Sequence, residues 1–144
     1  QCSTTVVTEG RDLPEEMWDM FKLFLTTQSR RDEQFKAYAC LERGGQEGHL
    51  HVQAVLDMFS TSTKKIHIDL KNSLKDDEGN LPAKLAVCVK ELAGTGTHTW
   101  HGMLGYCQKD RLLPHYVFFM VGNITDQDLE EGHARYLVLG RGDR

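Results

Sequence analysis

Two histidines one residue apart, His49 and His51, follow a glutamate, Glu42, across a glycine-rich segment. Side chains two residues apart on a β-strand point to the same face, so both imidazoles can reach one metal ion. Imidazole nitrogens and carboxylate oxygens are common ligands of divalent cations. Two neutral imidazoles and one carboxylate leave such an ion with net positive charge, which suits binding of an anionic phosphate. The spacing therefore predicts a metal site formed by Glu42, His49 and His51.

A second candidate group is a tyrosine, Tyr106, followed three residues later by Lys109. A phenol is a poor nucleophile at neutral pH, but it becomes useful where a cation polarises the phosphate that it attacks. Lys109 would position that phosphate or lower the pKa of Tyr106 by its charge. A metal site with a separate tyrosine indicates cleavage of a phosphodiester through a tyrosyl-phosphate intermediate.

The segment that carries Tyr106, residues 98–109, reads as a helix. We expect Tyr106 at the flank of this helix and Lys109 farther toward solvent on the same side. Gly102 and Gly105 are expected near the outer side, where they would leave space for a strand of nucleic acid. The apolar stripe that should pack on a sheet consists of Trp100, Met103, Leu104 and Cys107,.

Hydrophobic periodicity predicts the other elements. Strands are expected at residues 3–9, 35–43, 49–58, 84–92 and 115–122. Helices are expected from Pro14 to about residue 28, after residues 60–63 to about residue 74, at 98–109, and from a capping box of Thr125 and Asp128 to about residue 139,. This order predicts an α+β fold with a central five-stranded, largely antiparallel sheet and helices packed on it. We expect one domain over residues 1–144, excised from a longer protein.

The strands at 35–43 and 49–58 read as a hairpin around the glycine-rich loop. Glu42 is then expected roughly across from His49, and His51 shares their face. The alternate, apolar positions, such as Ala37 and Ala39, should pack on helices. The face that carries the metal ligands is expected to be the more open one.

Composition excludes some classes of protein. No apolar run approaches the ~20 residues of a membrane-spanning helix. Four scattered cysteines without a CxxC pair argue against a zinc knuckle and favour a reduced, intracellular setting,. The net charge of −4 is not typical of a nucleic-acid-binding protein, but it allows a local basic patch,.

Glu42, His49-Leu50-His51 and Tyr106-Cys107-Gln108-Lys109 occur in the order found in HUH endonucleases. They resemble the Rep-type, single-tyrosine branch, which includes viral replication initiators and related transposases. The domain also looks similar to eukaryotic replitron transposases. The family's first-strand motif is not clear in residues 3–9, and no GxxxxGK[ST] loop of a helicase is present.

The resemblance implies a metal-dependent endonuclease and strand transferase for single-stranded DNA, acting in rolling-circle replication or transposition. Tyr106 would form a 5′-phosphotyrosine with Lys109 assisting, while Glu42, His49 and His51 would hold Mn²⁺ or Mg²⁺. The implied partner is single-stranded DNA, including hairpin or terminal-repeat DNA, with no membrane. The implied location is intracellular, and nuclear in a eukaryote.

Two other function classes stay open. One is a non-catalytic module that binds single-stranded nucleic acid, although the aromatic-rich strand of RNA-recognition domains is missing. The other is a metal-dependent hydrolase that uses bound water. His98 and His101 precede Tyr106 and are interpreted as partly exposed helix histidines, and the role of Gln108 is left open.

Overall fold

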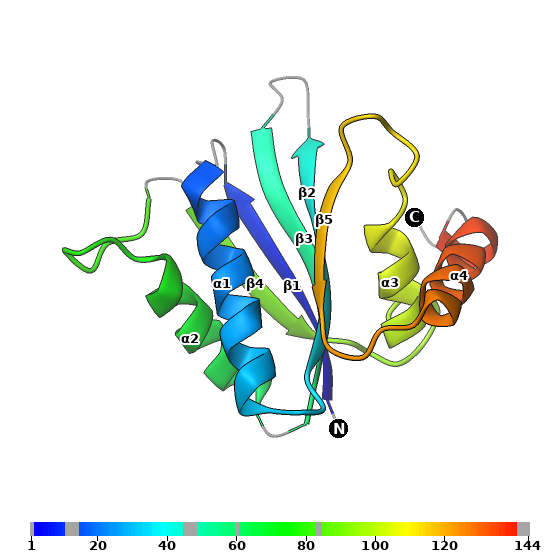
Figure 1. Ribbon diagram of the computed structural model, residues 1–144, viewed down its shortest axis with the longest axis horizontal. Coiled ribbons are helices and arrows are strands. Elements are labelled where there is room, and N and C mark those ends of the chain that lie inside the picture. Colours follow the sequence, from blue (N-terminus) through cyan, green and yellow to red (C-terminus); the bar gives the residue numbers. More distant parts are fainter. Residues whose placement is uncertain (1, 11–14, 45–48, 60, 83–84, 141–144) are drawn as a thin grey trace.

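The computed structural model describes residues 2–10, 15–44, 49–59, 61–82 and 85–140, and the side chains of residues 2–10, 15, 43, 44, 49 and 140 lie outside the description. Its centre is an antiparallel sheet in the order β4-β1-β3-β2-β5 (Figure 1). The strands are β1 (Cys2–Gly10), β2 (Lys36–Gly44), β3 (His49–Met58), β4 (Leu85–Glu91) and β5 (Val117–Val121). The α+β class predicted from the sequence is confirmed.

Helices cover both faces of the sheet (Figure 1). α1 (Glu15–Arg31) and α2 (Thr63–Leu74) pack on one face through an apolar core that includes Phe21, Leu70 and the β2 residues Ala37 and Ala39. The prediction that this parity of β2 packs on helices is confirmed. α2 begins after Ser62, whose hydroxyl accepts a hydrogen bond from the backbone N–H of Lys65,.

α3 (Trp100–Cys107) and α4 (Asp126–Arg135) cover part of the opposite face (Figure 1). Tyr38 and Cys40, which share the parity of Glu42, are buried there against Met103 and Leu104 of α3. The expectation of an open face on this side is therefore wrong over β2. Alternation along a strand shows which side chains share a face, but not which helix covers that face.

The ends of the later elements differ slightly from the prediction. α3 begins at Trp100 because the Thr99 hydroxyl accepts a hydrogen bond from the Gly102 N–H and caps the helix,. β5 begins at Val117 rather than at residue 115. The capping box of Thr125 and Asp128 is confirmed at the start of α4, which continues as a π-helical turn over Tyr136–Gly140.

Gly102 and Gly105 are buried, so the prediction that they lie on the outer side of the helix is wrong. A Cβ at Gly105 would clash with the carbonyl oxygen of Gly132 in α4, and one at Gly102 would lie 2.6 Å from the carbonyl oxygen of Thr97. Gly105 therefore allows α3 to pack closely against α4, and Gly102 allows α3 to pack closely against the loop that precedes α3.

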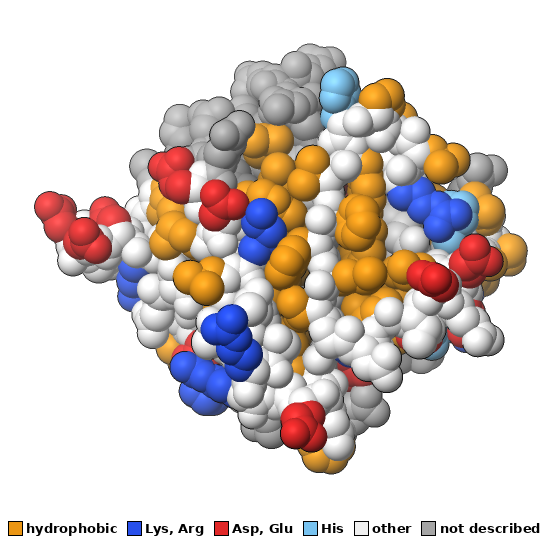
Figure 2. Space-filling model, viewed as in Figure 1, with side chains coloured by type: hydrophobic (Ala, Val, Ile, Leu, Met, Phe, Trp, Pro, Cys, Tyr) orange, Lys and Arg blue, Asp and Glu red, His pale blue; other side chains and the backbone are white. Residues whose placement is uncertain are grey.

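β5 forms an exposed edge of the sheet, and apolar side chains lie along it (Figure 2). Val117, Phe118 and Met120 are among the exposed large apolar residues. Within the described part of the chain, no helix is both long enough and apolar enough to cross a membrane.

Candidate active site

The register of the β2–β3 hairpin places Glu42 directly opposite His51. The Nε2 atom of His51 lies 3.1 Å from the Oε2 atom of Glu42, and their side chains are only 24% and 12% exposed. His49 pairs with Gly44 instead, so the expectation that Glu42 lies across from His49 is wrong by two residues. Two of the three predicted metal ligands are thus in contact.

The side chain of His49 lies outside the described residues, although its backbone belongs to β3. Among the side chains that are described, no group of three or more His, Cys, Asp or Glu residues is arranged to hold a metal ion. The three-residue ligand set therefore stays a prediction, with Glu42 and His51 as its described part.

Lys109 forms an ion pair with the Oε1 atom of Glu42. Its side chain is only 16% exposed, so the expectation that it extends toward solvent is wrong. The reason is local, because α3 ends at Cys107 and Lys109 no longer follows the helical wheel on which the expectation was based. The two oxygens of Glu42 therefore have different partners, His51 and Lys109.

The contact between Glu42 and Lys109 shifts the pKa of each group in the direction that favours its charged form. Burial alone would raise the pKa of Glu42, but the hydrogen bonds from His51 and Lys109 and the positive charge of Lys109 outweigh it and lower the pKa to about 2,. Burial would lower the pKa of Lys109, but the hydrogen bond and negative charge of Glu42 raise it above its usual value. Glu42 is therefore a carboxylate and Lys109 an ammonium at neutral pH.

Tyr106 lies on the other side of Lys109. The Nζ atom of Lys109 is 4.2 Å from the centre of the Tyr106 ring, a cation–π distance,. The Tyr136 ring packs edge-on against Tyr106, with 6.3 Å between the ring centres. Lys109 thus joins the predicted nucleophile to the predicted metal ligand Glu42.

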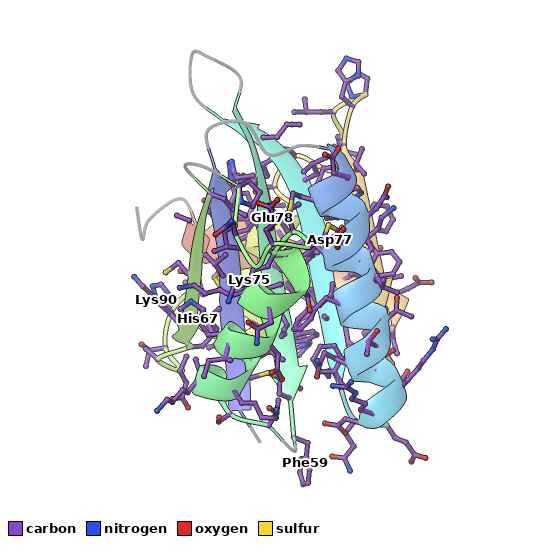
Figure 3. All side chains as sticks on the ribbon, turned by 90° about the vertical axis from the view of Figure 1, so that its left-hand side faces the viewer. Phe59, His67, Lys75, Asp77, Glu78 and Lys90 are labelled. Carbon is purple, nitrogen blue, oxygen red and sulfur yellow. The ribbon has the colours of Figure 1, made fainter. Side chains whose placement is uncertain are left out.

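Tyr106 lines a cavity of about 670 Å³, here called the β4–α3 cavity. Gln53 of β3 and Lys90 of β4 form part of its wall, together with His98 from the loop before α3. Lys90 extends from β4 at the edge of the sheet (Figure 3). Apolar walls with a few polar groups are typical of ligand-binding cavities.

Three residues whose roles the sequence left open have defined positions. His98 lies in the loop before α3, so its interpretation as a helix histidine is wrong, and it lines the β4–α3 cavity together with Tyr106. The Nε2 atom of His101 lies 3.2 Å from Asp128 and 3.4 Å from Glu131, so this histidine joins α3 to α4. The buried Gln108 amide donates to the carbonyl oxygens of Leu104 and Leu129 and joins the same helices.

A comparison with protein-family models matches residues 3–137 to the family described as "Replitron, HUH endonuclease domain". No curated protein and no solved structure gives a significant match to the chain. The match spans nearly the whole sequence and includes Glu42, His51, Tyr106 and Lys109. The chain therefore belongs to the replitron family of HUH endonuclease domains.

Proposed function

We propose that this domain cleaves and rejoins single-stranded DNA with Tyr106 as the nucleophile and a divalent metal ion at Glu42 and His51. The observation that carries this proposal is the position of Lys109. Its ammonium group contacts Glu42 on one side and the Tyr106 ring on the other. A phosphate drawn to this positive charge would be within reach of both the metal ligands and the phenol.

An imidazole nitrogen and a carboxylate oxygen are both ligands that divalent metal ions accept. The Nε2 atom of His51 and the Oε2 atom of Glu42 are 3.1 Å apart, so both would hold the same ion. We propose His49 as the third ligand and Mn²⁺ or Mg²⁺ as the ion. When bound, the ion would polarise the phosphoryl group and stabilise negative charge.

The chain's own groups would supply the nucleophile and a fixed positive charge. The Tyr106 oxygen forms a bond to phosphorus, and the bond from phosphorus to the 3′ oxygen of the preceding nucleotide breaks. Because its pKa is raised, Lys109 stays protonated and stabilises charge on the phosphate instead of accepting the phenol proton,. That proton passes to solvent, and the departing 3′ oxygen takes one from solvent.

The products would be a 5′-phosphotyrosine and a free 3′-hydroxyl. Attack of a 3′-hydroxyl on the phosphotyrosine restores a phosphodiester, so the same site both cuts and joins strands. This chemistry suits rolling-circle replication or transposition, with hairpin or terminal-repeat DNA as the substrate.

The test uses a single-stranded oligonucleotide that carries a transposon or origin end, labelled at either terminus and incubated with Mn²⁺. The 3′-terminal label should become linked to protein, whereas the 5′-terminal label should appear on a free fragment. Peptide mapping should place the link on Tyr106. Tyr106→Phe should abolish the adduct, and Tyr136→Phe, which alters the neighbouring ring, should retain it.

An adduct that survives in Tyr106→Phe would refute this nucleophile. Cleavage without any protein-linked DNA would indicate hydrolysis by bound water. Binding of the oligonucleotide with no cleavage in Mn²⁺ or Mg²⁺ would favour the alternative function, a non-catalytic module that binds single-stranded nucleic acid.

A further inference from the structure

Hydrogen bonds through two tyrosine side chains connect the end of α3 to β2. The Tyr116 hydroxyl, just before β5, donates to the carbonyl oxygen of Cys107, the last residue of α3, with 2.5 Å between the two oxygens. The hydroxyl of Tyr38 on β2 lies 2.7 Å from the Tyr116 hydroxyl. A phenol has one proton to donate, so Tyr38 donates to Tyr116. The hydrogen bonds therefore run from β2 through Tyr116 to the end of α3.

The carbonyl group that Tyr116 binds cannot be satisfied by its own helix. The last four C=O groups of an α-helix have no hydrogen-bond partner within that helix. Cys107 is 0% exposed, so its carbonyl oxygen is out of reach of solvent. A buried acceptor that lacks a donor destabilises the fold. Tyr116 therefore supplies a hydrogen bond that holds the end of α3 in place.

The Tyr116 side chain is itself held by its neighbours. Its ring stacks on Phe118, with 5.8 Å between ring centres, and Phe118 in turn stacks on the Tyr38 ring at 5.6 Å. The backbone N–H of Tyr116 donates to the carbonyl oxygen of Leu113. Burial raises the pKa of the Tyr116 phenol above its ordinary value, so the hydroxyl keeps the proton that it donates,. Tyr116 is therefore a fixed hydrogen-bond donor.

The same hydrogen bond closes the loop that carries Lys109. This loop connects α3 to β5, and the bond between Tyr116 and Cys107 joins its two ends. Lys109 lies two residues beyond Cys107. Glu42 lies four residues beyond Tyr38 on β2, so the two side chains share a face of the strand,. Tyr116 thus ties the base of the Lys109 loop to the strand that carries the carboxylate partner of Lys109.

We propose that Tyr116 is a positioning residue of the proposed nuclease, and this inference rests on the proposed function. The Tyr116 hydroxyl holds the end of α3 relative to β2, so that the ammonium group of Lys109 reaches Glu42 and the bound phosphate. Tyr116 itself touches none of the reacting atoms and acts through Lys109. Without the hydroxyl, the Cys107 carbonyl loses its donor, the loop shifts, and the positive charge moves away from the phosphate.

The experiment measures the rate of DNA adduct formation with Mn²⁺ at saturating single-stranded oligonucleotide. Tyr116→Phe removes the hydroxyl but keeps the ring and its stacking on Phe118. The rate of this variant should fall about tenfold, within the ~10²-fold loss that a displacement of about 1 Å in an active site can cause. The same substitution in a Lys109→Gln background should cause little further loss, because the charge that Tyr116 positions is already absent.

Tyr38→Phe is the matched control, because it also removes one hydrogen-bonded hydroxyl and keeps the ring, but leaves the bond from Tyr116 to Cys107. It should retain the wild-type rate. A wild-type rate in Tyr116→Phe, an equal fall in Tyr38→Phe, or a loss of the same size in the Lys109→Gln background would overturn the positioning role while leaving the nuclease intact. The two phenylalanine variants decide even where Lys109→Gln forms no adduct. Absence of any adduct in wild type would overturn the proposed function and this inference together.

Discussion

At the scale of residues, Glu42 connects the two halves of the site. One of its oxygens lies against His51 and the other pairs with Lys109. A group with these two partners keeps its negative charge even in acid, because both partners favour the ionised form,. The same contacts hold the carboxylate beside His51, where a metal ion would bind the Oε2 atom of Glu42 and the imidazole of His51 together.

The first prediction concerns stability and pH. The pKa of Glu42 is about 2 in the folded protein, below its usual value of 4.5, so its contribution should be full above about pH 4.5,. Glu42→Gln should lower the free energy of unfolding by about 2 kcal/mol at neutral pH. Urea unfolding of both proteins should show this difference shrinking as the pH falls toward 2. A difference that is unchanged at the lowest pH would contradict the ion pair as its source.

Strand alternation, a local rule, predicted that Glu42, His49 and His51 share one face of a hairpin. The register was wrong, because Glu42 was expected across from His49 and pairs with His51 instead. The position of Lys109 does not follow from a local rule, because it depends on where α3 ends. Gln108 caps that end, and its amide donates a hydrogen bond to the carbonyl oxygen of Leu129 in α4, 21 residues away in the chain.

At the scale of elements, α3 and α4 act as one unit that places Tyr106 over the sheet. Gly105 and Gly132 allow the two helices to touch, and the contacts of Gln108 and His101 hold them together. The sequence showed two glycines in a helix but not what they faced. Glycine would be needed both to leave space for DNA beside a helix and to let two helices cross closely. Only the packing of the helix shows which of these two reasons applies.

The second prediction follows from this crossing. Gly105→Ala forces a methyl group against the carbonyl oxygen of Gly132, so α3 must shift. We expect a loss of about 1–3 kcal/mol in the free energy of unfolding, as in other overpacked cores. The adduct rate should fall as well, because a shift of about 1 Å at a nucleophile can cost 10²-fold. Thermal unfolding and adduct formation measure the two effects.

Gly79→Ala is the control for a glycine substitution. Gly79 has a φ of 84° in an exposed turn, with no atom within 4 Å of the added methyl group. It should cost about 1 kcal/mol of backbone strain and leave the adduct rate unchanged. Equal adduct rates in Gly105→Ala and Gly79→Ala would contradict a positioning role for the helix crossing.

At the scale of the whole molecule, the described residues place α1 and α2 on one face of the five-stranded sheet and α3 and α4 on the other, and the proposed catalytic groups lie on the α3 side. The alternating and helical patterns predicted the order of the elements, because each pattern is local. They did not predict the distribution of helices over the two faces, because that depends on contacts between distant segments. The net charge of −4 likewise does not reveal that the positively charged Lys90 lines the β4–α3 cavity.

The third prediction concerns how an acidic chain binds DNA. Lys90 lines the β4–α3 cavity, so Lys90→Gln should weaken binding of single-stranded DNA by removing one phosphate contact. The slope of log affinity against log salt should become shallower by about 0.7. Lys64→Gln is the control, because Lys64 is exposed on α2, which covers the opposite face. Fluorescence anisotropy at several salt concentrations measures this slope for each variant. Equal slopes in both variants would place the DNA elsewhere.

The proposed function depends on a metal ion and the Tyr106 phenol both lying close to Lys109. A crystal structure with Mn²⁺, read through the anomalous scattering of the metal, tests this most directly. We predict one strong peak within bonding distance of the Oε2 atom of Glu42 and the Nε2 atom of His51, with the Tyr106 hydroxyl facing it. A peak bound by other residues, or a Tyr106 hydroxyl directed away from the metal, would contradict the account.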